Sequence, residues 1–189
     1  MKYKIVLVLV FTLIIASCKK TINCIIETNE GNLLIELYPE KAPISVANFL
    51  EYVDKGLYEN SSFYRVTTPA NEAGRTIKIE VIQGGILDEE KQLAPIKIET
   101  TKQTGILHKK GTLSMARDEP NTATNHFFIC VNAQPSLDFG GKRNPDGLGF
   151  AAFGKVIEGS EIVKKIQNRE NEEQRLLKPV IIKNIKRVE

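Results

Sequence analysis

The chain has 189 residues and a formal net charge of +3, with 26 lysines and arginines against 23 acidic residues. This length fits one ordinary domain with a sizeable core. The near balance of charge excludes the concentrated basic face of a nucleic-acid-binding protein, and the Lys19-Lys20 and Lys109-Lys110 pairs are too short to create one.

The first residues are predicted to be a signal rather than part of the fold. Residues 1–4 form a basic start, and Ile5 to Ile15 is an apolar run broken only by Thr12. The run is shorter than the roughly 20 residues that cross a bilayer, but it suits the apolar region of a secretory signal. The following "IASC" resembles the bacterial lipoprotein signal, which implies cleavage after Ser17 and lipid on Cys18.

We therefore predict a signal peptide over 1–17, a lipidated Cys18 with a short tether over 18–23, and one domain over 24–189. The tether spans less than about 20 Å, so it holds the domain close to its membrane. The expected location is the bacterial cell envelope, on the periplasmic side of the outer membrane, because Lys19 differs from the usual aspartate of inner-membrane retention. The alternative is an ordinary secreted protein in which Cys18 occurs by chance.

Few side chains in the sequence suggest covalent or metal chemistry. Cys24 and Cys130 can pair in an oxidising periplasm if geometry allows, although the apolar setting "FFICV" favours a buried free thiol at Cys130. No Cys/His cluster has zinc spacing, so we expect no metal and no cofactor. His108 and His126 are the only histidines, and no Ser–His–Asp set is predicted.

A β-hairpin and a helix are predicted first along the chain. Cys24–Thr28 and Leu33–Leu37 are apolar-rich, and residues 29–32, "NEGN", supply the turn. Pro43 suits the first turn of a helix that ends near Gly56. One apolar face recurs at helical spacing: Val46, Leu50, Val53 and Leu57.

The rest of the chain is predicted to be mostly short strands. They are "SSFYRV" (61–66), "IKIEVIQGG" (77–85), "GTLSMA" (111–116), "HFFICV" (126–131), "GFAAFGKV" (149–156) and a last strand over Val180–Val188. A second helix is predicted over Glu161–Asn168, with Ser160 as its N-cap. Many short strands at close spacing favour a mainly β, mostly antiparallel closed sheet with two helices.

Five blocks, in this order, resemble the cyclophilins: "FYRV", "VIQGG", "GTLSMARDEPNTATNHFFI", "PSLDFGG" and "GFAAFGKVIEG". The resemblance covers Ile22 to Glu189 and is closest to a bacterial subgroup. It implies a peptidyl-prolyl cis–trans isomerase on a closed eight-stranded antiparallel β-barrel capped by two α-helices. It also implies a monomer that acts on X–Pro segments of unfolded or exported proteins.

The same resemblance implies the site residues. Arg65 matches the catalytic arginine of the family, and Gln83 matches the glutamine that helps to place it. Phe63 matches a core aromatic before the arginine. It is also counted with the implied substrate-binding residues, which are Phe63, Val81, Ala116, Arg117, His126, Phe128, Leu137 and Phe150.

The sequence also departs from the short cytosolic forms. Ser136 replaces a tryptophan associated with cyclosporin binding, so weak drug sensitivity is expected. The segment 66–82 is longer than its counterpart, and aligning back from "QGG" puts Glu80 and Val81 at two pocket positions. Because Glu80 would replace an aromatic residue, the alternative function is a weakly catalytic proline-peptide binding module or holdase chaperone.

Overall fold

The structure, a computed structural model, describes residues 21–188. The predicted signal peptide, Cys18 and the first part of the tether lie outside the described residues. The first strand begins at Ile22, two residues before the predicted start of the domain.

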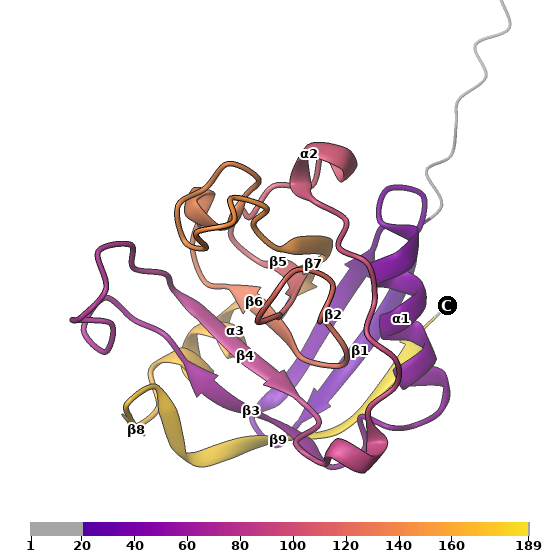
Figure 1. The fold of residues 1–189 in the computed structure, drawn as a ribbon. Helices are drawn as coiled ribbons and strands as arrows, with labels where there is room; N and C mark the ends of the chain where they lie inside the picture. The colour runs from indigo at the N-terminus through magenta and orange to yellow at the C-terminus, as the bar shows by residue number, and fades with distance from the viewer. Residues whose placement is uncertain (1–20, 189) are drawn as a thin grey trace, which may run out of the picture.

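One antiparallel sheet closes on itself into a barrel (Figure 1). Around the barrel the strands follow the order β1 (Ile22–Thr28), β2 (Gly31–Leu37), β7 (Ala151–Glu158), β5 (Thr112–Met115), β6 (Phe127–Cys130), β4 (Val81–Gly85), β3 (Ser61–Val66) and β9 (Arg175–Val188), and β9 pairs back with β1. The two-residue β8 (Asn171–Glu172) pairs with β9. The predicted closed eight-stranded barrel is therefore confirmed.

The two predicted helices pack against the barrel. α1 (Pro43–Asp54) packs against β7 and β9, and α3 (Ser160–Gln167) packs against β2, β3 and β4. A third, one-turn helix, α2 (Thr101–Thr104), was not predicted. It follows a capping box in which Thr100 and Gln103 exchange side-chain and backbone bonds.

Aromatic rings fill the main core between α1 and the barrel. Phe49 of α1 lies 5.3 to 5.5 Å from the rings of Tyr58, Phe127 and Phe153. Each such side chain stabilises the fold by roughly 1.5–3 kcal/mol when it is buried. A second, smaller apolar cluster lies apart from this core and contains Ile79, Val81, Phe128, Cys130 and Leu137.

Three predicted boundaries need correction. β4 begins at Val81 rather than at residue 77, because the backbone of Ile79 bonds to the side chain of Glu72 and that of Ile77 to the side chain of Arg143. Ser160 is the first residue of α3 rather than its cap, since Gly159 takes the cap position with φ 87°. The last strand begins at Arg175 rather than at Val180, because its first residues pair with β8.

Both cysteines of the described chain are free thiols. Cys24 and Cys130 are buried and form no disulfide. Burial raises the pKa of Cys24 to about 11 and raises that of Cys130 as well, so both thiols stay protonated near neutral pH. Cys24 and Cys130 are therefore two separate, buried and unreactive thiols rather than a disulfide.

Candidate active site

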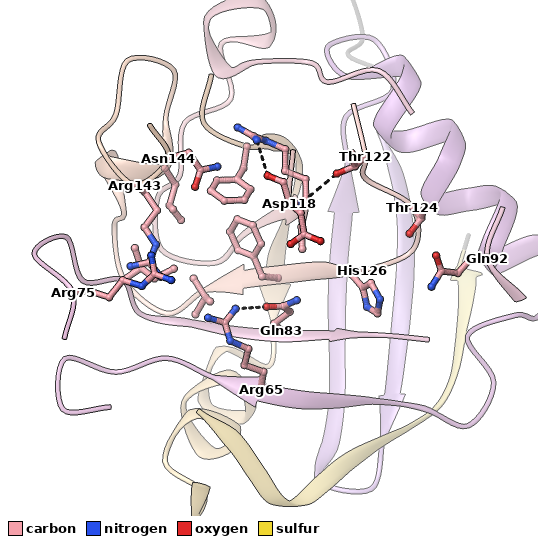
Figure 2. A pocket seen from close by; sticks show the side chains of 17 residues that line it. Arg65, Arg75, Gln83, Gln92, Asp118, Thr122, Thr124, His126, Arg143 and Asn144 are labelled. Carbon is pink, nitrogen blue, oxygen red and sulfur yellow. Dashed lines mark hydrogen bonds between the residues drawn. The ribbon is translucent and has the colours of Figure 1, made fainter. Parts of the chain in front are cut away.

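A pocket of about 500 Å³ gathers most of the predicted site residues (Figure 2). β3, β4 and β6 contribute lining residues, and the loops that follow β3, β4, β5 and β6 contribute the rest. The predicted residues that line it are Arg65, Val81, Gln83, Ala116, Arg117, His126, Phe128, Leu137 and Phe150. Of the predicted set, Phe63 alone is not among the lining residues.

A β-bulge explains the different positions of Phe63 and Arg65. In the ladder between β3 and β4, Phe63 pairs with Gly84 and Arg65 pairs with Gln83, so Tyr64 is an extra residue. Such a bulge changes the direction of the side chains that follow it. Phe63 is fully buried and packs edge-on against Phe127. The structure therefore places Phe63 in the core, as its match to a core aromatic implies, and not with the substrate-binding residues among which we had also counted it.

Two neutral amide oxygens hold the guanidinium of Arg65. Its Nη1 donates to Oε1 of Gln83 at 2.6 Å, while its Nε and Nη2 donate to Oε1 of Gln174 at 3.0 and 2.5 Å. Within residues 21–188 no carboxylate forms an ion pair with Arg65. These bonds use three of the five guanidinium N–H groups, so two donors and a full positive charge remain for a ligand.

The charge on Arg65 is secure at neutral pH. Burial is the main cause that lowers the pKa of Arg65 from its ordinary value, and the nearby carboxylate of Glu72 works in the opposite direction. Because an arginine side chain does not deprotonate in proteins, the group stays cationic while partly desolvated. A partly desolvated cation interacts with a ligand dipole more strongly than one surrounded by water.

A chain of hydrogen bonds continues from Gln83 to His126. Nε2 of Gln83 donates to the hydroxyl of Tyr64 at 2.9 Å, and that hydroxyl lies 3.0 Å from Nδ1 of His126. Burial lowers the pKa of His126 below its ordinary 6.5, so the ring is neutral at pH 7, and in the tautomer with its proton on Nε2 the Nδ1 atom accepts a hydrogen bond from the Tyr64 hydroxyl. This chain fixes the amide of Gln83 with its oxygen toward Arg65.

The second glycine of "QGG" is required by this chain. Gly85 has φ 144°, and a Cβ atom at this position would lie 2.6 Å from Nδ1 of His126. Any side chain at Gly85 would therefore displace the imidazole and break its bond to Tyr64.

The smaller apolar cluster forms the floor of the pocket beside Arg65. Phe128 meets the edge of Phe150 at 5.4 Å, and Val81 and Leu137 are almost fully buried next to it. His108 stacks on the opposite side of Phe128 at 5.9 Å, which fixes the angle of the ring. The result is an apolar patch on the wall of the pocket that Arg65 also lines.

The register of the long segment after β3 differs from our prediction. Ile79 and Val81 line the pocket, whereas Glu80 turns away and accepts a bond from Asn132 at 3.2 Å. Alternate residues of an extended chain point to the same face, so Ile79, Val81 and Gln83 share one side. The two pocket positions that we assigned to Glu80 and Val81 are therefore occupied by Ile79 and Val81, and both are apolar.

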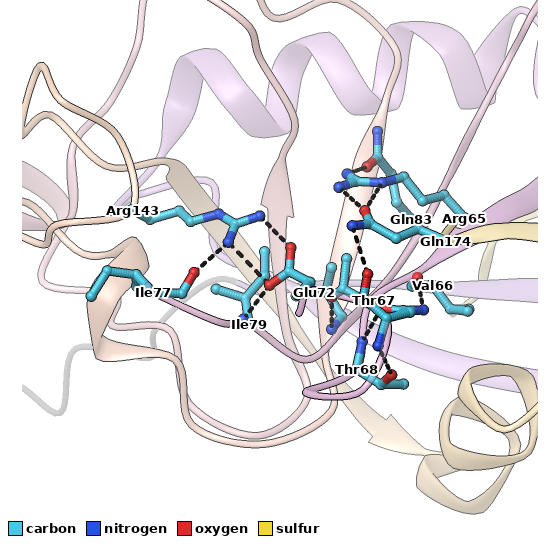
Figure 3. A network of polar contacts seen from close by, with 12 residues as sticks. Arg65, Val66, Thr67, Thr68, Glu72, Ile77, Ile79, Gln83, Arg143 and Gln174 are labelled. Atoms are coloured by element: carbon cyan, nitrogen blue, oxygen red, sulfur yellow. Dashed lines mark hydrogen bonds and ion pairs between the residues drawn. The ribbon is translucent and has the colours of Figure 1, made fainter. Parts of the chain in front are cut away.

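A buried ion pair holds this segment in place (Figure 3). Glu72 and Arg143 lie 2.5 Å apart with side chains 0% and 7% exposed. The Glu72 carboxylate also accepts from the backbone N–H of Ile79 at 2.7 Å, and Arg143 donates to the carbonyl of Ile77 at 2.6 Å. The pair thus sets the position from which Ile79 reaches the pocket.

Arg117 uses its side chain inside the protein. Its guanidinium donates to the carbonyl of Gly149 at 2.7 and 3.0 Å, pairs with Asp146, and lies 5.3 Å from the centre of the Phe150 ring. The N–H of the neighbouring Ala116 donates to the carbonyl of His126 at 2.8 Å. The side chain of Arg117 therefore holds Phe150 against the pocket.

Behind the pocket lies a Ser–His–Asp arrangement that we did not predict. Nε2 of His108 is 3.0 Å from Oγ of Ser114, and its Nδ1 is 2.7 Å from Oδ1 of Asp138. Ser114 is 0% exposed, so no substrate carbonyl reaches its hydroxyl. The three residues act as a rigid support for Phe128 rather than as a nucleophile.

Several lining residues were missed by the sequence analysis. They are Arg75, Ile79, Gln92, Asp118, Thr122, Thr124, Arg143 and Asn144. Asp118, Thr122 and Thr124 lie within the block "SMARDEPNTATNHFFI", which indicated this part of the pocket without singling them out. Ile79 could have been identified from its alternation with Val81, and the remaining residues come from loops, where no periodic pattern indicates the direction of a side chain.

Comparisons with known proteins agree with this geometry. The family described as "Cyclophilin type peptidyl-prolyl cis-trans isomerase/CLD" matches residues 24–187. A peptidyl-prolyl cis-trans isomerase of Acinetobacter baylyi is 40% identical over 147 residues, which are 75% of this chain and 70% of that protein. Peptidyl-prolyl cis-trans isomerase B of Escherichia coli is 38% identical over 145 residues, which cover 74% and 80% of the two chains.

A solved structure shows the same fold. The cyclophilin type isomerase of Cryptosporidium parvum aligns with a TM-score of 0.71 at 24% identity and covers 90% of this chain and 99% of its own. With the family match, the bacterial relatives and the pocket built around Arg65, the chain belongs to the cyclophilin-type peptidyl-prolyl cis-trans isomerases.

Proposed function

We propose that this enzyme assists the folding of exported proteins and that Arg65 accelerates rotation about their X–Pro bonds. The observation that carries the proposal is the un-neutralised guanidinium of Arg65, fixed by Gln83 and Gln174 in a pocket whose wall also carries the apolar cluster around Phe128. A related isomerase of Cryptosporidium parvum, 25% identical with a TM-score of 0.70, was crystallised in the presence of the dipeptide Ala-Pro. That ligand agrees with a proline-sized slot beside Phe128.

The reaction needs no bond to be made or broken. Rotation about a peptide bond is opposed by its partial double-bond character, with a barrier of about 18–20 kcal/mol. In the twisted state the prolyl nitrogen is pyramidal and carries a lone pair. A group that donates a hydrogen bond to this lone pair binds the twisted state better than either planar state, which is the requirement for catalysis.

The pocket can both hold the proline ring and donate a hydrogen bond to the prolyl nitrogen. Ile79, Val81, Phe128 and Leu137 hold the proline ring, and Arg65 offers its remaining N–H groups to the nitrogen. A hydrogen bond from a charged group contributes about 1.5–3 kcal/mol, and partial desolvation strengthens it. Each 1.36 kcal/mol removed from the barrier raises the rate tenfold, so this one contact supplies about one to two orders of magnitude.

An exchange experiment tests catalysis directly. Cis–trans exchange of an Ala-Pro peptide is followed by two-dimensional NMR with and without the protein, which needs no coupling protease. We expect exchange to accelerate in proportion to enzyme concentration, and proline-limited refolding of a denatured protein to accelerate likewise. Saturable peptide binding without faster exchange would favour the alternative binding module. Glu80 does not line the pocket, so the main argument for that alternative no longer applies.

Replacing Ile79 with alanine tests the corrected register. Because Ile79 walls the proline slot, the change should raise KM and lower kcat/KM by about tenfold, as expected for lost apolar contact. Glu80→Ala is the matched control, since its side chain points to Asn132 outside the pocket. Kinetics from the exchange assay that place the loss at Glu80 rather than at Ile79 would show that our original register was right.

We further propose that the enzyme is a monomeric lipoprotein of the cell envelope, anchored at Cys18 and facing the periplasm from the outer membrane. The apolar run Ile5 to Ile15 followed by "IASC" supports this. Among residues 21–188 no helix has the length and apolarity that crossing a bilayer takes. Labelling of expressing bacteria with a clickable fatty acid should mark the wild type and not Cys18→Ser. Equal labelling of both, or a wild type in the inner-membrane fraction, would contradict the proposed anchor or its location.

A further inference from the structure

The second residue that holds Arg65 comes from an unexpected place. Gln174 lies in the turn between β8 and β9, and its side-chain oxygen accepts from both Nε and Nη2 of Arg65 at 3.0 and 2.5 Å. Gln174 is not among the residues that line the pocket, so its side chain meets Arg65 away from the ligand. It therefore acts on the guanidinium and not on the substrate.

The backbone at this turn adopts an unfavourable conformation. Glu172 pairs with Arg175, which leaves Glu173 and Gln174 as a two-residue turn with φ 46° and 75°. Positive φ at both positions defines the type I′ turn, which strongly prefers Asn-Gly because side chains crowd the backbone there. Neither residue is glycine or asparagine, so the turn is strained in a way that a simple substitution would relieve. Strain of this kind points to a function that needs the residue.

Neighbouring contacts orient the Gln174 amide. Its backbone carbonyl accepts from the N–H of Val66 at 2.8 Å, next to Arg65 on β3. Its side-chain Nε2 donates to the carbonyl of Asn71 at 3.4 Å, and Asn71 also donates to the side chain of Asn171 at 2.9 Å. Because the nitrogen of the amide faces Asn71, its oxygen faces Arg65.

We propose that Gln174 is a positioning residue for Arg65, and that the strained turn is retained because it carries this side chain to the guanidinium. The inference rests on the proposed function, since it assumes that Arg65 acts on the substrate. Gln83 and Gln174 bind different N–H groups of the guanidinium, so together they prevent its rotation. Both acceptors are neutral, which holds the cation without cancelling its charge.

Gln174→Gly separates this role from a structural one. Glycine accepts φ 75° without strain, so the variant should unfold at the same or a higher temperature than the wild type. Its kcat should nevertheless fall about tenfold with little change in KM, because a catalytic group that is misplaced by a fraction of an ångström loses effect. Glu173→Gly is the matched control. It relieves the backbone strain at the neighbouring position but keeps the side-chain amide of Gln174, so it should retain wild-type kcat.

Two further measurements locate the effect at Arg65. In an Arg65→Ala background, Gln174→Gly should cause no additional loss of rate. By NMR, the Nε–H resonance of Arg65 should shift and exchange faster with water in Gln174→Gly but not in Glu173→Gly.

The outcomes distinguish this inference from the proposed function. Suppose that the wild type is active and that Gln174→Gly keeps both the wild-type kcat and an unchanged Arg65 Nε–H resonance. That result would overturn the positioning role alone. Wild-type activity in Arg65→Ala would overturn the proposed mechanism, and the positioning role with it.

Discussion

Arg65→Ala should lower kcat/KM for X–Pro isomerisation by about 10²-fold, which is the upper end of what one charge-assisted hydrogen bond contributes and the lower end of the loss seen when one fixed donor to a transition state is removed. The guanidinium has no carboxylate partner in the described chain and two N–H groups that no protein group uses. Its interaction with the twisted prolyl nitrogen exists only in the transition state, so the loss should fall on kcat more than on KM. The exchange assay with a saturating peptide measures both constants.

Arg65→Lys should lose most of the activity as well. A lysine ammonium is a compact charge that cannot donate to Gln83 and Gln174 with the fixed fork of a guanidinium. Arg187→Ala is a suitable control, because Arg187 pairs with Asp54 on the exposed surface. Thermal unfolding should show that all three variants remain folded. Retained activity in Arg65→Ala would refute the proposed mechanism.

The sequence predicted the barrel because strands show a local pattern, and it predicted most of the pocket because its ordered blocks resemble those of the cyclophilins. Alternating strands and the ordered blocks indicate which residues share a face, and Arg65, Gln83 and Phe128 lie on adjacent strands, where those patterns fix their directions. The bulge at Tyr64 could not be predicted from these patterns. One extra residue separates Phe63, which lies in the core, from Arg65, which lines the pocket, and no local pattern marked it.

Contacts between distant residues could not be predicted in this way. Gln174 reaches Arg65 across 109 positions, and Arg143 reaches Glu72 across 71. Such pairs have no period in the sequence and depend on how loops fold over the finished barrel. The alternation of Ile79 and Val81 was nevertheless readable, and it would have indicated Ile79 as a pocket residue in place of Glu80.

Removing the Glu72 carboxylate should be the most destabilising single change in the loop after β3. Glu72→Ala leaves the 7% exposed Arg143 side chain without its counter-charge and the N–H of Ile79 without its acceptor. Breaking a buried pair in this way costs about 3–5 kcal/mol, a large part of the roughly 5–15 kcal/mol that holds a domain folded. Chemical denaturation should report this loss, and KM should rise because Ile79 is no longer fixed beside the pocket.

Two controls separate the buried pair from an ordinary surface charge. Glu51→Ala breaks the pair with Lys55, whose side chains are both 52% exposed, and should change the free energy of unfolding by less than about 1 kcal/mol. A Glu72→Leu and Arg143→Met double variant should recover much of the stability lost in Glu72→Ala, because an apolar pair avoids the cost of an unpaired buried charge. If Glu72→Ala were as stable as Glu51→Ala, the loop would not depend on this ion pair, and another contact would have to hold Ile79 in the pocket wall.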